Sequence, residues 1–400
     1  MGLILKSLMP AYGGYTIARD EKVIFIKGAI PGEVVEVDIE ERKKRYSVAS
    51  AVNVVESSED RVEPECSAFG ICGGCQLQFI AYERQLAMKD EILLDSLTRL
   101  AGIEIAPGPA LSDSQWNYRH RAGFKVSRDG DVGFFKGSSR DVVTFDSCPL
   151  MDDTINKMLR KIKETGAALN LKEIHIAAGD SPVALLKGRD LDRTICDKFI
   201  EIGFSGVVCN ELDAPGQAYT GFDLNGMKYT VSPRTFFQSH WRLNTKVVDL
   251  IVNRLMPLSG KRVLDLYAGA GNFSMPLAVH AEEVVAVEEN RYAVEDGTRN
   301  LKLNNIRNCR FVSSSAEKYK IKKKFDIVIL DPPRPGLTSG VMEKILENSP
   351  GSIVYISCNP ATCARDLKKL KEKYEVLSVQ LIDFFPNTFH IESVVFLRLG

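Results

Sequence analysis

The sequence predicts an α/β protein with a doubly wound parallel sheet in its C-terminal part and a small all-β barrel at its N-terminus. From residue 234 onward, short apolar runs alternate with helical stretches, and parallel strands need such crossovers. In residues 1–56, runs such as VIFI and VVEVDI are separated by glycine-containing turns, which is typical of a barrel of short strands. Residues 57–233 mix strands and helices without a repeat, so three domains are expected: 1–56, 57–233 and 234–400.

Composition sets broad limits on what the chain does. Lys plus Arg equals Asp plus Glu, 52 each, so no global field steers the chain toward nucleic acid. No apolar run reaches the roughly 18 residues of a membrane span, and the first residues lack the features of a signal peptide. A cytoplasmic location is therefore expected. In that reducing compartment the 9 cysteines predict metal binding, catalysis or burial rather than a disulfide framework.

The N-terminal barrel has too few apolar residues for a large pocket, and its RKKR turn is expected to be exposed. These features fit a barrel of the oligonucleotide-binding type, with a purely structural β-domain as the alternative. The next regular element is a helix over residues 82–102, where a helical period ends in the glycine stop Gly102.

A cysteine cluster precedes that helix. The stretch CSAFGICGGCQLQ holds Cys66, Cys72 and Cys75, and its paired glycines let the backbone turn tightly around a bound group. Cys148, in FDSCPL, is the best candidate for a fourth ligand because a proline follows it. The three-plus-one arrangement and the absence of a second C-x2-C favour an iron–sulfur cluster, although zinc also accepts four cysteines.

The stretch VLDLYAGAGNFS predicts a strand, a glycine-rich turn and a helix start. Gly269 and Gly271 allow a ligand to approach the backbone closely, but Ser274 replaces the last glycine of a dinucleotide fingerprint. The next strand ends in Glu288, placed to bind a ribose, and the fourth strand ends at Asp331 in DPPRPG. Together these positions indicate the methyl-donor site of a class I S-adenosylmethionine methyltransferase.

The stretch YISCNPATC follows the fifth strand of this half. Cys358 lies at the carboxyl end of the strand, Asn359 can cap the next helix, and Pro360 falls in its first turn. The helix dipole is therefore expected to lower the pKa of Cys358, whereas Cys363 is expected to pack inside the helix. Three other cysteines have no partner nearby in the sequence and are expected to be buried: Cys196, Cys209 and Cys309.

A thiolate beside a methyl donor suggests methylation of uracil at C5. Addition of a thiolate to C6 makes C5 nucleophilic, and a general base must then remove the C5 proton. Glu392, at the start of the last strand, is the candidate base, because burial can raise the pKa of a carboxylate. His390 is the competing candidate.

On these motifs the chain resembles, from end to end, the S-adenosylmethionine-dependent RNA uridine-5-methyltransferases of the tRNA and 23S rRNA type. The segments that carry the resemblance are CSAFGICGGCQLQ, FFQSH, DLYAGAGNF, SCNPATCARDL and HIESVVFL. The resemblance implies a class I (Rossmann-like) methyltransferase domain, an N-terminal RNA-binding TRAM barrel and a central α+β domain that holds iron–sulfur and contacts RNA. One departure is Phe79, which stands where the family often has a histidine.

The resemblance also implies roles for individual residues. Cys358 is the implied nucleophile and Glu392 the implied base. S-adenosyl-L-methionine is the implied methyl donor, held by Gln238, Tyr267, Gly269, Asn272, Glu288 and Asp331. A [4Fe-4S] cluster is the implied metal group, bound by Cys66, Cys72, Cys75 and Cys148. No radical-donor cysteine motif is present, so polar methyl transfer is expected.

The expected partner is structured RNA, either rRNA or tRNA, with the target uridine swung out of its stack. No membrane and no obligate protein partner are expected, and the oligomeric state stays open. Arg119, Arg121 and Lys125 are candidate phosphate contacts, with a solvated sheet face as the alternative.

Three rival functions are weighed against uridine methylation. RNA cytosine-5 methylation is disfavoured because DPPRPG lacks a cysteine. A nicotinamide oxidoreductase is disfavoured by Ser274, and a non-catalytic RNA-binding iron–sulfur protein by the presence of both Cys358 and Glu392.

Overall fold

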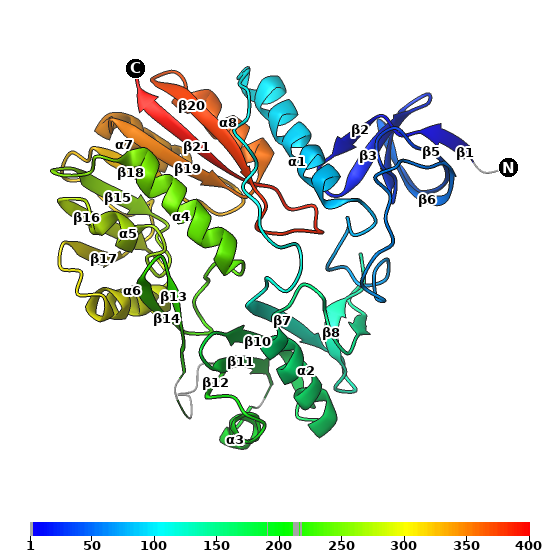
Figure 1. Ribbon diagram of the computed structural model, residues 1–400, viewed down its shortest axis with the longest axis horizontal. Helices are drawn as coiled ribbons and strands as arrows, with labels where there is room; N and C mark the ends of the chain where they lie inside the picture. Colours follow the sequence, from blue (N-terminus) through cyan, green and yellow to red (C-terminus); the bar gives the residue numbers. More distant parts are fainter. Residues whose placement is uncertain (1–2, 190, 211–215, 217) are drawn as a thin grey trace.

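The computed structural model describes residues 3–189, 191–210, 216 and 218–400 (Figure 1). Its described strands form two six-stranded sheets, one two-stranded hairpin and one seven-stranded sheet. The small N-terminal β-domain and the α/β sheet at the C-terminus are both confirmed, and a second mixed region lies between them in sequence.

The N-terminal sheet has the order β1-β5-β6-β4-β3-β2, and β1 also lies against β3, so the sheet curls around a small core. Alternate residues of β4 are buried, as expected for strands with one face inside. Gly13 and Gly14 have φ of 96° and 80° in the turn between β2 and β3, a conformation that favours glycine. The six strands are β1 (Leu3–Lys6), β2 (Met9–Ala11), β3 (Tyr15–Arg19), β4 (Val23–Lys27), β5 (Val34–Arg42) and β6 (Tyr46–Glu56).

The predicted helix after the cysteine cluster is present as α1 (Tyr82–Ser96), extended by a π-helical turn, η1 (Leu97–Ala101). It ends at Gly102, whose φ of 60° is left-handed. Buried leucines of both segments share a core with the C-terminal sheet. Lys89 of α1 also forms a buried ion pair with Asp383 (2.6 Å), so this helix joins the cysteine-rich segment to the C-terminal half.

The central sheet has the order β12-β11-β10-β7-β8-β9, with two helices packed beside it (Figure 1). Its strands are β7 (Arg121–Val126), β8 (Val132–Phe135), β9 (Val142–Thr144), β10 (Leu171–Ala178), β11 (Pro182–Gly188) and β12 (Gly206–Cys209). Its helices are α2 (Asp153–Thr165) and α3 (Arg193–Glu201). The side chains of Asp152 and Asp192 cap these two helices.

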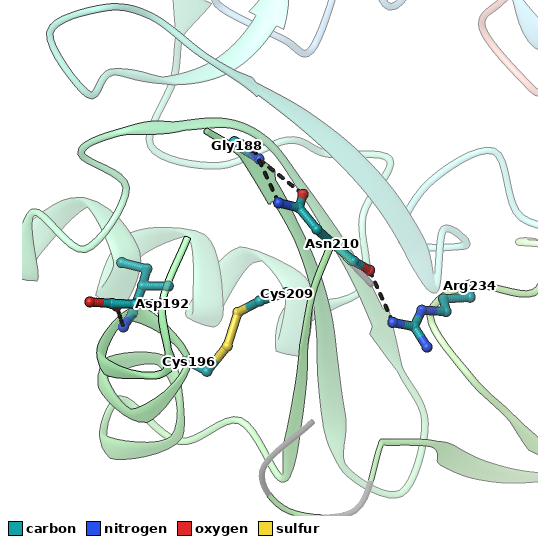
Figure 2. Close-up of a disulfide and its surroundings, with 7 residues drawn as sticks. Gly188, Asp192, Cys196, Cys209, Asn210 and Arg234 are labelled. Atoms are coloured by element: carbon teal, nitrogen blue, oxygen red, sulfur yellow. Dashed lines mark hydrogen bonds between the residues drawn. A yellow bond between two sulfur atoms is a disulfide. The ribbon is translucent and has the colours of Figure 1, made fainter. Parts of the chain in front are cut away.

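A disulfide in this domain corrects one expectation from the sequence (Figure 2). Cys196 and Cys209 were expected to be buried without a partner, yet they pair with each other across a Cα–Cα distance of 6.6 Å. The pairing arises because α3 packs against β12 and brings the two cysteines together. Both are buried as expected, and so is Cys309 on the C-terminal sheet.

A hairpin of β13 (Thr220–Leu224) and β14 (Met227–Val231) connects the two sheets in sequence but packs on the C-terminal core. The backbone N–H of Thr230 donates to the amide oxygen of Asn300 at 2.8 Å, which ties the hairpin to a C-terminal helix. The domain boundary at residue 233 stays a prediction.

The C-terminal sheet has the order β17-β16-β15-β18-β19-β21-β20. Its strands are β15 (Arg262–Leu266), β16 (Glu283–Glu288), β17 (Cys309–Ser313), β18 (Ile327–Leu330), β19 (Ser352–Ser357), β20 (Tyr374–Ile382) and β21 (Glu392–Leu399). The helices of this half are α4 (Trp241–Leu255), α5 (Ser274–Ala278), α6 (Arg291–Leu303), α7 (Ser339–Asn348) and α8 (Pro360–Leu370).

The prediction of a parallel sheet is wrong for one strand, β21. Strand β21 pairs antiparallel with both β19 and β20, whereas β15 to β19 are parallel. The reason is the connection between β20 and β21, residues 383–391, which contains no helix and returns as a loop. The reversal brings the start of β21 to the sheet edge where β15, β16, β18 and β19 end. Side chains from all five strands can therefore meet there.

In the part of the chain that the structure describes, no helix is long and apolar enough to cross a membrane.

Candidate active site and a cysteine-lined cavity

A cleft of about 510 Å³ opens at this edge of the sheet. Of the eight positions predicted for catalysis and donor binding, seven line it: Gln238, Tyr267, Gly269, Glu288, Asp331, Cys358 and Glu392. They come from the ends of four parallel strands, the start of β21 and the segment before α4. The fold therefore brings together residues that are far apart in the sequence.

The turn after β15 forms one wall of the cleft. Tyr267 has a φ of 65°, which is unusual for a bulky residue and is a form of backbone strain found at functional sites. Gly269, with φ of 55°, donates its backbone N–H to the carboxylate of Glu288 at 2.9 Å. The other carboxylate oxygen of Glu288 accepts from the N–H of Asn290 at 2.8 Å. The backbone thus holds this carboxylate in a fixed orientation at the cleft.

Two more carboxyl groups lie beside Glu288. Burial raises the pKa of Asp331 to about 7, and the charge of Glu288 adds to the effect. Burial likewise raises the pKa of Asp265, on β15, to about 7. Asp265 accepts a hydrogen bond of 2.5 Å from the hydroxyl of Ser274. Ser274, which breaks the dinucleotide fingerprint, therefore supplies a hydrogen bond to one oxygen of a buried carboxyl group.

Gln238 and Asn272 differ in how well they suit ligand binding. Gln238 is buried, and no group in the described part of the chain hydrogen-bonds to its side-chain oxygen. A buried acceptor without a partner at a cleft wall fits a site that a ligand completes. Asn272 is not among the described residues that line the cleft, because its side chain exchanges hydrogen bonds of 2.7 and 3.0 Å with Asn244.

Cys358 lies directly after β19, and Asn359 caps α8 as expected, accepting from the N–H groups of Ala361 (3.0 Å) and Thr362 (3.4 Å). The expected lowering of the Cys358 pKa is wrong. Burial raises the pKa of this thiol to about 11, and the charges of Glu392 and Asp331 raise it further. The helix dipole does not determine the pKa of Cys358, because the Asn359 side chain already accepts hydrogen bonds from the first free amides of α8. The nearby carboxyl groups of Glu392 and Asp331 act in the opposite direction.

Glu392 is the first residue of β21, and it is buried where it lines the cleft. Burial raises its pKa to about 8, with smaller contributions from Asp331 and Asp383. The raised value agrees with the expectation for a carboxyl group that serves as a general base.

His390 competes poorly for that role. Its ring nitrogen Nδ1 lies 3.2 Å from a guanidinium nitrogen of Arg334, so this nitrogen accepts a hydrogen bond from the arginine. Burial and then the charge of Arg334 lower the pKa of His390 to about 4. Among the described residues lining the cleft, His390 is absent.

Arg334 is a residue that sequence reasoning missed. It lines the cleft within DPPRPG, and its charge opposes the rise in pKa of both Cys358 and Glu392. The sequence could have indicated Arg334, because it follows the fourth strand, and ligands of such sheets bind at the carboxyl ends of the strands.

A separate cavity is lined by the four predicted metal ligands, Cys66, Cys72, Cys75 and Cys148. Burial raises the pKa of Cys75 to about 12 and that of Cys148 to about 11. In the described part of the chain, no three His, Cys, Asp or Glu side chains are grouped closely enough to hold one metal ion. The four thiols thus surround one space without meeting at a single point.

Two amide side chains that the sequence did not single out hold this cavity in shape. Gln78 accepts from the backbone N–H of Cys66 at 3.1 Å. Asn156, on α2, accepts from the N–H of Cys148 at 2.9 Å and donates to its carbonyl at 3.1 Å. Phe79, which departs from the family pattern, is buried beneath the guanidinium of Arg61, 4.7 Å from the ring centre.

The candidate phosphate contacts are mostly engaged within the protein. Arg121 donates to the carbonyl of Thr235 at 2.6 Å, and Lys125 forms an ion pair with Glu173. Arg119 and Arg121 nevertheless line a groove of about 330 Å³. The groove shares Phe236 with the wall of the catalytic cleft, so the two depressions are neighbours.

Comparisons with known proteins agree with this geometry. The family model of the tRNA (Uracil-5-)-methyltransferases matches residues 222–399, and that of the TRAM domain matches residues 10–52. An uncharacterized RNA methyltransferase of Aquifex aeolicus is 34% identical, covering 97% of this chain and 96% of its own. The 23S rRNA (uracil(1939)-C(5))-methyltransferase RlmD of Vibrio campbellii is 32% identical, covering 94% and 90%.

A solved structure covers the whole chain. The Pyrococcus abyssi tRNA (uracil-54, C5)-methyltransferase, in complex with S-adenosyl-L-homocysteine, is 25% identical with a TM-score of 0.79, covering 99% of this chain and 100% of its own. Sequence and structure therefore agree over nearly the full length, and the chain belongs to the S-adenosylmethionine-dependent RNA uracil-5-methyltransferases with an N-terminal TRAM domain.

Proposed function

We propose that this RNA uracil-C5 methyltransferase uses Cys358 as its nucleophile and Glu392 as its base, on a uridine of 23S rRNA or tRNA. The observation that carries the proposal is that one cleft is lined by both side chains and by most of the residues assigned to the methyl donor. The two named relatives, one acting on 23S rRNA and one on tRNA, support both RNA classes.

The residues of the cleft suit each step of the reaction. After its proton has left to solvent, the sulfur of Cys358 adds to uracil C6, and the ring's electron pair moves to C5. S-adenosyl-L-methionine supplies the methyl group that C5 takes up. Glu392 then accepts the C5 proton, and elimination of the Cys358 thiolate restores the C5–C6 double bond. The buried position of Glu392 shields the base from bulk water.

Three features of the cleft wall suit the methyl donor. Glu288 presents a carboxylate oriented by two backbone amides, which suits a ribose. Gly269 leaves the backbone open to close approach, and a Cβ there would meet no atom of the described residues within 4 Å. Gln238 offers a side-chain oxygen to which no described residue hydrogen-bonds. Tyr267 and Asp331 complete this set, whereas Asn272 would act through its backbone or by holding α4 in place.

We further propose that Cys66, Cys72, Cys75 and Cys148 hold a [4Fe-4S] cluster. Thiolates that bind a single zinc ion at about 2.3 Å must lie about 4 Å apart. The four thiols line a shared space, and among the described residues no three of them lie close enough together to hold one ion, which suits a cluster of several metal atoms better. Such a cluster would hold the central domain together, since its ligands come from the loop before α1 and from the segment before α2.

We also propose that the reaction takes place in the cytoplasm. The decisive experiment incubates the protein with S-adenosylmethionine and RNA containing 5-fluorouridine. Because the base cannot remove fluorine, a stable protein–RNA adduct should form, and peptide mapping should find it on Cys358. Separate rRNA and tRNA substrates identify the RNA class. An adduct on another residue, or none with either RNA, would reject the nucleophile assignment.

A further inference from the structure

Tyr12 of the N-terminal barrel contacts the loop that leads to Glu392. Tyr12 follows β2, and its ring meets Phe389 edge to face, with ring centres 5.6 Å apart. Phe389 belongs to the loop between β20 and β21, directly before the catalytic end of β21. Gly14 also lies close to this loop, since a Cβ added there would come within 3.6 Å of Phe389. The barrel therefore touches the loop that leads to Glu392.

A row of side chains continues from Tyr12 into the cleft. The ring of Phe389 packs against His390, with centres 4.4 Å apart. His390 in turn accepts a hydrogen bond from Arg334 at 3.2 Å, and Arg334 lines the cleft together with Cys358 and Glu392. We call this row of Tyr12, Phe389, His390 and Arg334 the cleft rim; of these four described residues, Arg334 lines the cleft itself, and Tyr12 lies at the outer end of the row.

Tyr12 is available to a ligand although it is fixed in place. Its side chain is 38% exposed, while the edge-to-face contact holds the ring. Partial burial raises the pKa of its hydroxyl, the charge of Arg334 opposes the rise, and the charges of Cys358 and Glu392 add to it. Tyr12 therefore lies within electrostatic reach of the catalytic groups.

We propose that Tyr12 is a positioning residue that stacks on the RNA base next to the target uridine. The inference rests on the proposed function, because it assumes that a uridine leaves its stack to reach Cys358. A flipped uridine leaves a neighbouring base without its stacking partner, and an exposed aromatic ring can replace that partner. Arg334, at the inner end of the same row, is placed for the phosphate that joins the two nucleotides. The barrel then stabilises the RNA conformation in which the uridine is flipped out, in addition to binding the RNA strand.

The test compares Tyr12→Ala with Tyr46→Ala. Tyr46 is a matched control because it is also 38% exposed on the barrel, but its ring contacts Phe25 within the barrel instead of the cleft rim. Formation of the 5-fluorouridine adduct is measured in a single turnover at saturating RNA, and RNA affinity is measured separately. Tyr12→Ala should slow adduct formation about tenfold, the size of one lost base–aromatic contact. Tyr46→Ala should leave that rate unchanged.

A second variant separates the ring from its hydroxyl. Tyr12→Phe keeps the ring and should form the adduct within about twofold of the wild-type rate. Equal slowing by Tyr12→Phe and Tyr12→Ala would overturn stacking, as would a loss of RNA affinity with no change in rate. Unchanged thermal unfolding and donor binding check that the variants fold. If wild-type protein forms no adduct, the proposed function fails; if it does and Tyr12→Ala matches it, only this inference fails.

Discussion

The cleft at the sheet edge and the cysteine-lined cavity both contain cysteine side chains, but the surroundings of these thiols differ. In both, burial raises the thiol pKa, to about 11 for Cys358 and to about 12 for Cys75. In the cleft a single thiol faces two carboxyl groups and Arg334, and the space is open to a large substrate. In the cavity four thiols face one another among aromatic rings. The two settings therefore differ more in the number of neighbouring thiols and in the size of the space than in the pKa of one thiol.

The largest effect should come from removing the single thiol. Cys358→Ala should lower methyl transfer from labelled S-adenosylmethionine to RNA by roughly 10⁴-fold or more, because no other described residue that lines the cleft carries a thiol. Iron content should be unchanged. Cys363→Ala is the matched control, since this fully buried neighbour packs inside α8. If Cys358→Ala retained activity, the contrast between the two kinds of cysteine would break down.

The carboxyl group opposite the thiol is the next test. Glu392→Gln should lower turnover by about 10²- to 10⁴-fold, since the C5 proton then has no acceptor. Methylated RNA should remain bound to Cys358 and appear as a shifted band on a denaturing gel. His390→Gln, altering the poor base nearby, should change turnover only slightly. The reverse pattern would make His390 the base.

Removing one thiol from the cavity should affect structure more than chemistry. Cys75→Ser should remove the iron and the brown colour of anaerobically purified protein. It should also lower Tm by about 5–10 °C, corresponding to a loss of about 2–4 kcal/mol. Cys309→Ser, at a buried cysteine outside both sites, is the control for thiol loss alone. Wild-type protein with stoichiometric zinc and no iron would refute the cluster.

The smallest expected effect is a dependence of Tm on pH that arises from Glu392 in the cleft. The pKa of Glu392 is raised from 4.5 to about 8 in the folded protein, so folding favours its protonated form. The contribution of this group to the free energy of unfolding is fully present below pH 4.5, and it is lost as the pH rises through about 8. Tm should therefore fall by a few degrees from pH 5 to 9, while methyl transfer rises as the carboxylate forms. A steeper fall of Tm in Glu392→Gln than in wild type would contradict this assignment.

Local patterns in the sequence determined much of this protein. The apolar runs placed β15 to β19, the Asn359 cap placed the start of α8, and the glycine-rich turn placed Gly269 at the cleft. These features are readable because strand periods, caps and turns depend on residues within a few positions of one another. The spacing of Cys66, Cys72 and Cys75 is local in the same way, whereas Cys148 lies far from them in the sequence.

Tertiary structure decided what depends on distant neighbours. Reversal of β21 brought Glu392 to the cleft, and packing of α3 on β12 paired Cys196 with Cys209. The pKa of Cys358 rose where the helix dipole alone predicted a fall, because burial and through-space charge outweighed it. Tyr12 reached the cleft rim from the opposite end of the chain. Burial and electrostatics act through space, so only the folded chain determines which side chains they couple.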